Sequence, residues 1–274
     1  MSEAATTKKA VTKTKKNEVQ TIGLASKFAQ DAGMGMENIK SEDLVIPRIK
    51  LCQSGSPQIK KSHELYIPGL EVGDVFNSLT GQVWSIDEGF FVVPCAYRFT
   101  HTEWHPIETK KGIVGELDVN DPRLHPNNIR ETENPRKDFF IDSGLEYVKT
   151  AEHYVMVVDI ETGEYQQSLL PMKSTSLKHS RAWNTQIKMQ SVPHDGGRIR
   201  LPSFACIWQL GSVEVTKANT WHEYKIIGRH SIVEDENLYE DAKAFSELIQ
   251  SGVSVALDEE ELGMGPEAPE MKFD

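Results

Sequence analysis

Apolar and polar residues alternate in several segments from Ser41 onward, and this period-2 pattern predicts β-strands. The strands come mostly in pairs separated by short turn sequences, which is typical of antiparallel hairpins. Pro94 lies inside the strongest strand and predicts an edge or a bulge there. The predicted strands are Val75–Leu79 with Gln82–Ile86, Gly89–Thr100, His153–Asp159 with Tyr165–Leu170, and Phe204–Thr216 with Trp221–Val233.

Two segments show helical spacing instead. The run Leu169–Gln190 contains a helix start, with Ser174 or Thr175 as the expected N-cap. Asp235–Ser251 places Leu238, Ala242, Phe245 and Ile249 on one face, so it predicts a second helix.

This order of elements predicts a mainly β fold with few helices. About six strands in hairpin pairs, with one inserted helix, favour an elaborated OB-fold-like antiparallel barrel. A β-sandwich fits the same pattern, because periodicity does not distinguish closure from stacking.

The expected domain organisation has three parts. Residues 1–40 are rich in Lys, Ala and Thr and predict a disordered arm, residues 41–251 a single nucleic-acid-binding domain, and residues 252–274 an acidic disordered tail. Within the domain, the polar, proline-rich stretch His105–Glu152 is interpreted as one long connection.

Charge is distributed unevenly along the chain. From Glu234 to the end there are 13 acids and 2 lysines; subtracting these from the totals of 41 acids and 30 Lys and Arg leaves 28 of each. The net charge of -11 therefore belongs to the C-terminal segment, and the body is neutral.

Composition and motifs exclude several classes. No apolar run approaches the roughly 20 residues that span a bilayer, so a cytoplasmic protein without membrane contact is expected. Cys52, Cys95 and Cys206 form no CxxC pair and predict buried, reduced thiols; His101, His105 and Cys95 are too few for a convincing zinc site. Phosphate-binding, nucleophile-elbow, HExxH and GxGxxG motifs are absent, so we expect neither an enzyme nor a cofactor.

Within this neutral body, one stretch is strongly basic. Between Met172 and Ser203 six Lys and Arg face a single acid, Asp195, and several of them share one helix face. Such a local positive field predicts a phosphate-backbone binder, although a basic helix face is often only solvated surface. The candidate DNA-binding cations are Lys173, Lys178, Arg181, Lys188, Arg198 and Arg200.

Aromatic residues interleave with these bases and with the strands. Single-strand binders stack bases on aromatic rings while cations follow the phosphates. Core packing is the competing interpretation for each ring. The candidate stacking residues are Tyr97, Phe99, Trp104, Trp183 and Trp221.

The C-terminus carries its own candidate site. Leu257–Asp274 is acidic, contains Gly and Pro, and ends in Phe273 and Asp274. An acidic tail of this kind can compete with DNA for a basic surface, and its aromatic residue can bind a partner's pocket. Phe273 and Asp274 are therefore the predicted partner-binding residues; a solubilising tail is the alternative.

The succession IPRIKLCQSGSP, GDVFNSLTGQVW, LLPMKSTSLKHSRAWN and PSFACIWQL, followed by that tail, resembles a family of tailed-phage single-stranded DNA-binding proteins. The resemblance spans Ser41–Asp274. It is similar in logic to the OB-fold proteins of short-tailed phages, whose acidic tail with a terminal aromatic docks on the replication machinery. Phe273 is here penultimate, a departure from that pattern.

The sequence hypothesis is therefore a phage protein that coats single-stranded DNA without sequence preference in replication and recombination, in the host cytoplasm. Its tail would recruit phage replication proteins such as a polymerase or a helicase-primase, and a homodimer is compatible with the sequence. The alternative is a virion or assembly protein with no DNA binding.

Overall fold

The computed structural model describes residues 27–28, 30–31, 34–38, 45–106, 109, 111–133, 136–217 and 219–252. The chain divides into two compact units, Met1–Leu44 and Val45–Asp274, and all the elements below belong to the second. Most of the predicted N-terminal arm, and the acidic tail from residue 253 on with Phe273 and Asp274, lie outside the described residues.

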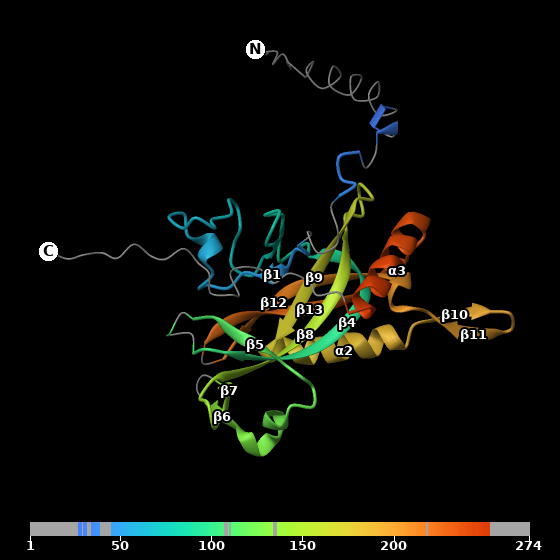
Figure 1. The fold of residues 1–274 in the computed structure, drawn as a ribbon. Coiled ribbons are helices and arrows are strands. Elements are labelled where there is room, and N and C mark those ends of the chain that lie inside the picture. Colours follow the sequence, from blue (N-terminus) through green and yellow to red (C-terminus); the bar gives the residue numbers. More distant parts are fainter. Residues whose placement is uncertain are drawn as a thin grey trace, which may run out of the picture. The chain divides into compact units, whose positions relative to one another are not determined.

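The second unit is mainly β, as predicted, and each of its strand ladders is antiparallel (Figure 1). Its strands are β1 (Ile49–Leu51), β2 (Val75–Asn77), β3 (Val83–Trp84), β4 (Phe90–Trp104), β5 (Ile113–Leu117), β6 (Ile129–Glu133), β7 (Arg136–Phe140), β8 (Glu146–Val158), β9 (Tyr165–Lys173), β10 (Ser191–His194), β11 (Gly197–Arg200), β12 (Cys206–Thr216) and β13 (Thr220–Ile232). The helices are α2 (Leu177–Lys188) and α3 (Glu236–Gln250), with short 3-10 turns at Pro57–Ile59, Pro122–Leu124, Pro126–Asn128, Ser174–Ser176 and Ser203–Ala205.

The largest sheet is built on the long pair β4 and β8. Its strand order is β13-β12-β4-β8-β7-β6, with β5 added to β4 and β9 added to β8. Among the described residues this order does not return to its first strand, so the ladders do not close the predicted barrel. Strands β1, β2 and β3 form a separate sheet, which contacts β9 through a bridge between Arg48 and Leu169.

The predicted hairpins β2–β3, β8–β9 and β12–β13 are confirmed. Pro94 lies at a register shift of β4 against β8 and between the stretches of β4 that pair with β12 and β5. Its missing N–H therefore breaks no ladder on that side, and the predicted bulge and local edge both occur.

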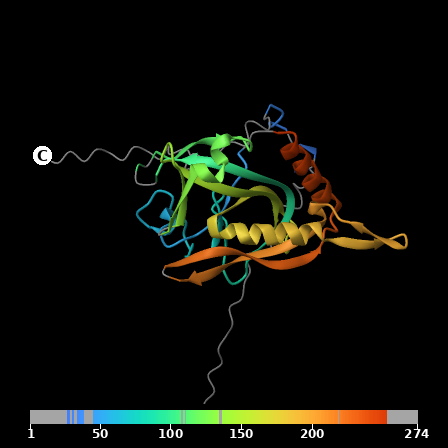
Figure 2. The same ribbon diagram turned by 90° about the horizontal axis from the view of Figure 1, so that it is seen from below.

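The prediction of one long connection from His105 to Glu152 is wrong, because this stretch contains β5, β6 and β7 and the start of β8. These strands are held partly by cross-strand ion pairs, which an apolar alternation pattern does not reveal. Lys137 Nζ lies 2.7 Å from Glu146 Oε2, and Lys149 Nζ lies 2.9 Å from Asp138 Oδ2. The hairpin β10–β11 was also not predicted; it projects beyond the end of α2 (Figures 1 and 2).

Two hydrophobic clusters occupy the opposite faces of the β4–β8 pair. One contains Val92 and Val155 with Trp183 of α2 and Trp208 of β12. The other contains Tyr154 and Met156 together with the apolar face of α3, Leu238, Ala242, Phe245 and Ile249. Full burial of each large side chain stabilises the fold by about 1.5–3 kcal/mol, so both helices are fixed to the sheet.

The predicted helix α3 is confirmed, and the structure adds its N-cap: the Asp235 carboxylate accepts a hydrogen bond from the backbone N–H of Leu238 at 3.0 Å. The predicted thiols are also confirmed: Cys52, Cys95 and Cys206 are free and buried. Of the described residues, none belongs to a helix long and apolar enough to cross a membrane.

Candidate nucleic-acid interface

Helix α2 carries three of the six predicted cations, and its N-cap, Ser176, lies one or two residues later than expected. Ser174 has a φ of 49°, in the left-handed region, and it lies outside α2. Ser174–Ser176 forms a 3-10 turn, and α2 begins at Leu177 without a side-chain hydrogen bond from its N-cap, Ser176. The prediction of a cap at Ser174 or Thr175 is therefore wrong.

The buried side of α2 is centred on Trp183. Its ring centroid lies 4.7 Å from that of His153 and 6.3 Å from that of Trp208, and the residue is 0% exposed. Beside it, Ser180 Oγ lies 2.8 Å from His153 Nε2. Because neither face of the indole is accessible, Trp183 cannot stack on a base in this conformation. The prediction of Trp183 as a stacking residue is therefore withdrawn, and its role here is core packing.

The opposite side of α2 is cationic and exposed, as its spacing predicts. Lys178, Arg181, Thr185 and Lys188 are all solvent-exposed, and the Thr185 hydroxyl donates to the Arg181 carbonyl at 3.0 Å. Within the described part of the chain, Arg181 and Lys188 have no ion-pair partner. Both charges can therefore interact with an external anion.

Lys178 differs from these two because its ammonium is already paired. Its Nζ lies 2.6 Å from Glu223 Oε2, and the Glu223 side chain is only 1% exposed. His179 Nε2 lies 3.0 Å from the same oxygen, and Trp221 Nε1 donates to Glu223 Oε1 at 2.9 Å. Burial alone would raise the pKa of Glu223, but hydrogen bonds from Lys178, His179, Trp221 and Thr175 outweigh it and lower the pKa to about 2.

Three arginines lie near the C-terminal end of α2. Arg200 Nη1 donates to the carbonyl of Lys188 at 3.3 Å, and Arg229 Nη1 donates to Gln190 Oε1 at 2.9 Å. Arg198 donates from Nε and Nη2 to the hydroxyl and carbonyl of Ser191, at 3.0 and 2.8 Å. The negative end of the helix dipole favours cations at this position.

We call this exposed set the cationic surface. It consists of Arg181 and Lys188 of α2, Arg198 and Arg200 of β11, and Arg229 of β13. Arg229 was not predicted, because it lies far from α2 in sequence and no local pattern marks it. The pairing of β12 with β13 places Arg229 opposite Trp208 and so brings it to this surface.

Two predicted aromatic residues lie near α2. Tyr97 is 44% exposed, and its ring lies 5.1 Å from His153, which itself contacts Ser180 and Trp183. Trp221 is partly buried, bonded to Glu223, with Lys217 Nζ 6.0 Å from its ring centroid.

The remaining candidates do not join the cationic surface. Phe99 is partly buried and packs against the core cluster that contains Trp183. Trp104 and Lys173 lie together elsewhere, with the Lys173 ammonium 5.0 Å from the Trp104 ring centroid. The part of the chain that the structure describes contains no cluster of His, Cys, Asp and Glu that could hold a metal.

Comparison with known proteins places the chain in a phage family. The family model of Pam3 phage gp34-like proteins matches residues 14–254, which cover both helices and all the strands described above. This chain belongs to the Pam3 phage gp34-like protein family. It is thus a phage protein. The family match covers the cationic surface but assigns no function to it, and neither a curated protein nor a solved structure matches the chain.

Proposed function

We propose that this phage protein binds single-stranded DNA, without sequence preference, along the cationic surface beside α2. The observation that carries the proposal is the clustering of Lys188, Arg198, Arg200 and Arg229 around one helix end, in a body whose net charge is zero. Three of these arginines are held in place by hydrogen bonds to the α2–β10 junction. Ordered, exposed guanidinium groups lose less freedom when they bind phosphate.

The character of the surface favours backbone contacts over base reading. Phosphate contacts position a nucleic acid but carry no sequence information. Exposed Tyr97 and partly exposed Trp221 would add stacking, which is worth about 1–3 kcal/mol per base and tolerates any sequence. We therefore propose a role in coating single strands during phage replication or recombination, without catalysis or cofactor.

A second part of the proposal concerns the acidic C-terminal tail and is based on its sequence. Leu257–Asp274 carries seven acids and one lysine, and it ends in Phe273 and Asp274. We propose that this segment recruits phage replication proteins and competes with DNA for the cationic surface. The setting would be the cytoplasm of the infected host.

The test is a titration of tryptophan fluorescence with oligo-dT and with duplex of equal length, at several salt concentrations. Quenching by oligo-dT, with weak response to duplex, is expected. Each phosphate contact contributes about -0.7 to the slope of log K against log salt, so removing two contacts should flatten the slope by about 1.4.

The matched variants are Arg198→Ala with Arg200→Ala, against Lys60→Ala with Lys61→Ala. Both pairs remove two exposed cations, but Lys60 and Lys61 lie next to the Pro57–Ile59 turn, far from α2 in sequence. The proposal requires the first pair to weaken binding and the second to leave it unchanged. Equal effects would mean non-specific attraction, and no binding by the wild type would favour an assembly role in the virion.

A further inference from the structure

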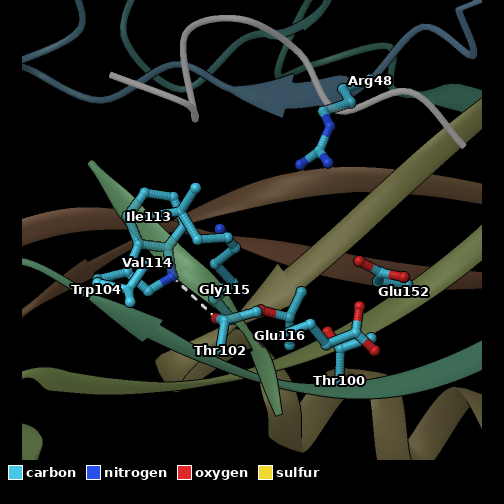
Figure 3. A pocket seen from close by; sticks show the side chains of 11 residues that line it. Arg48, Thr100, Thr102, Trp104, Ile113, Val114, Gly115, Glu116 and Glu152 are labelled. Carbon is cyan, nitrogen blue, oxygen red and sulfur yellow. Dashed lines mark hydrogen bonds between the residues drawn. The ribbon is translucent and has the colours of Figure 1, made fainter. Parts of the chain in front are cut away.

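A cavity of about 180 Å³ lies beside β4 (Figure 3), and its lining includes no residue of the cationic surface. Its lining comes from the β4–β5 hairpin, β8, the end of β9 and the residue preceding β1. Its lining includes Trp104 and Lys173, two of the sequence-predicted residues that do not join the cationic surface.

The cavity and α2 occupy opposite faces of the same strand pair. Along β8, Ala151 and His153 point into the cluster that contains Trp183, so the alternate residues Thr150 and Glu152 point the other way. Thr150 and Glu152 both line the cavity. A ligand there would thus be separated from α2 by the sheet.

Two threonines form the floor of the cavity. Thr100 and Thr150 are directly opposite each other in the β4–β8 register and are only 3% and 4% exposed. Neither hydroxyl has a hydrogen-bond partner among the described residues. Both residues line the cavity, and a hydroxyl can donate and accept, so this pair can bond to a bound group.

The indole of Trp104 forms one wall. Its Nε1 donates to Thr102 Oγ1 at 2.9 Å, and Thr102 Oγ1 in turn donates to the carbonyl of Val148 at 3.3 Å. This chain of bonds fixes the plane of the ring. Figure 3 shows Ile113 beside the same ring, and Ile113 is its partner across the β4–β5 ladder, so this wall is apolar.

The other side of the cavity is charged. Figure 3 shows the guanidinium of Arg48 and the carboxylate of Glu152 on the side away from Trp104. Arg48 is 4% exposed, and Glu152 Oε2 accepts a hydrogen bond from the Tyr154 hydroxyl at 3.1 Å. Burial raises the pKa of Glu152, while Arg98 and Arg48 oppose that rise. Glu116, also in the lining, is paired with Arg98 at 3.0 Å.

We propose that this cavity binds a single unpaired nucleobase, stacked on Trp104 and held at its edge by Arg48, Glu152 and the two threonine hydroxyls. A base presents a donor and an acceptor side by side, which a guanidinium and a carboxylate together can satisfy. The volume is below the roughly 300–1,000 Å³ of pockets for drug-sized ligands, so it suits one ring system and not a whole nucleotide. The Lys173 ammonium lies 5.0 Å from the Trp104 ring centroid, so a stacked base would take its place over the ring.

The site goes beyond the proposed function, because it does not need the cationic surface. The base could belong to a single strand or to a free nucleotide, and both present the same edge. A base within a duplex is excluded, since its edge is already paired and its faces are stacked.

The experiment uses the full chain with the four 2′-deoxynucleosides, their 5′-monophosphates and oligo-dT as probes. Equilibrium dialysis measures the affinity. The resonance of the ¹⁵N-labelled Trp104 indole shows whether the ligand binds in the cavity. At least one nucleoside should bind and shift that resonance, with little dependence on salt because it is uncharged. Tighter binding of the monophosphate would assign free nucleotides as ligands, and tighter binding of an oligonucleotide would assign strand bases.

Thr150→Val keeps the shape and removes one hydroxyl, so it should weaken nucleoside binding by about fivefold or more. Trp104→Leu should weaken it by about tenfold or more through lost stacking. The double substitution Arg198→Ala with Arg200→Ala should leave nucleoside affinity unchanged, but it should weaken the binding of oligo-dT. The proposal is overturned if no nucleoside binds at millimolar concentration, or if binding is unaffected by both cavity variants in folded protein. Nucleosides test the cavity, and oligo-dT with the arginine variants tests the cationic surface. If one of these proposals is wrong, the other can therefore still be measured.

Discussion

The Lys178 ammonium lies 2.6 Å from the carboxylate of Glu223, a side chain that is 1% exposed. This contact joins the N-terminal end of α2 to β13 and makes Lys178 unlike the other cations of the helix. Sequence spacing places Lys178 on the same face as Arg181 and Lys188, but only the packing shows that its charge is already compensated.

Glu223 should make stability depend on pH in the acidic range. Its pKa is about 2 in the folded protein and roughly 4.3 in an unfolded chain. The stabilisation is therefore complete above the unfolded pKa and is lost as the pH falls from about 4.3 towards 2. Lys178 is largely exposed, so solvent screens the ion pair. We therefore expect ionised Glu223 to contribute about 2 kcal/mol to the free energy of unfolding.

Thermal melts of wild type and Glu223→Gln between pH 2.5 and 7 would measure this. The variant should be less stable at pH 7 and should lose this part of the acid dependence. Glu214→Gln, an exposed position on the neighbouring strand β12, is the control and should behave as wild type. Parallel acid curves for all three proteins would contradict the assignment.

The same ion pair predicts unequal effects of two substitutions on one helix. Under the proposed function, Arg181→Ala should weaken oligo-dT binding by several-fold and flatten the salt slope by about 0.7. Lys178→Ala should change affinity less than twofold, because its ammonium neutralises Glu223. Salt-dependent titrations of both variants provide the comparison, and a larger loss for Lys178→Ala would refute it.

Trp183 should affect stability and not base stacking. Its indole is fully buried against His153 and Trp208, so Trp183→Ala should cost about 3–5 kcal/mol in the free energy of unfolding. Urea unfolding measures that loss. Trp183→Leu keeps part of the packing without an aromatic ring, and in folded protein it should retain wild-type affinity for oligo-dT, whereas loss of a stacking residue would weaken binding.

Removal of the acidic tail should tighten DNA binding at low salt. A chain ending at Ala256 loses seven acids and one lysine, a net charge of -6, and with it the proposed competitor for the cationic surface. The gain should shrink as salt rises, because screening weakens the competition. Phe273→Ala in the full chain is the control: it should leave DNA affinity unchanged and weaken partner binding. Equal affinity of the truncated and full chains would exclude self-competition.

Much of the fold follows from local pattern. The hairpins β2–β3, β8–β9 and β12–β13, the helix α3 and the exposed cationic face of α2 are all marked by period and by turn or cap residues. Each of these signals depends on residues that are close in sequence, where side-chain direction is fixed by the backbone repeat.

Strands β5 to β7 and the β10–β11 hairpin were not predicted, because local sequence pattern does not mark them clearly. Strands β6, β7 and β11 contain many charged residues, so they lack the apolar alternation that marks a half-buried strand, and β5 alternates in burial over only five residues. Ion pairs such as Lys137 with Glu146 connect positions on different strands, and their pairing is decided only when the sheet assembles.

The sequence alone therefore determined the mainly β class, the basic stretch and the separation of charge between body and tail. Tertiary structure decided that Trp183 is buried, that Glu223 neutralises Lys178, that Arg229 joins Arg198 and Arg200, and that Trp104 and Lys173 line a cavity on the opposite face of the sheet. The reason is physical: composition and period fix which side chains an element presents, whereas burial and charge pairing depend on distant segments that meet only in the fold.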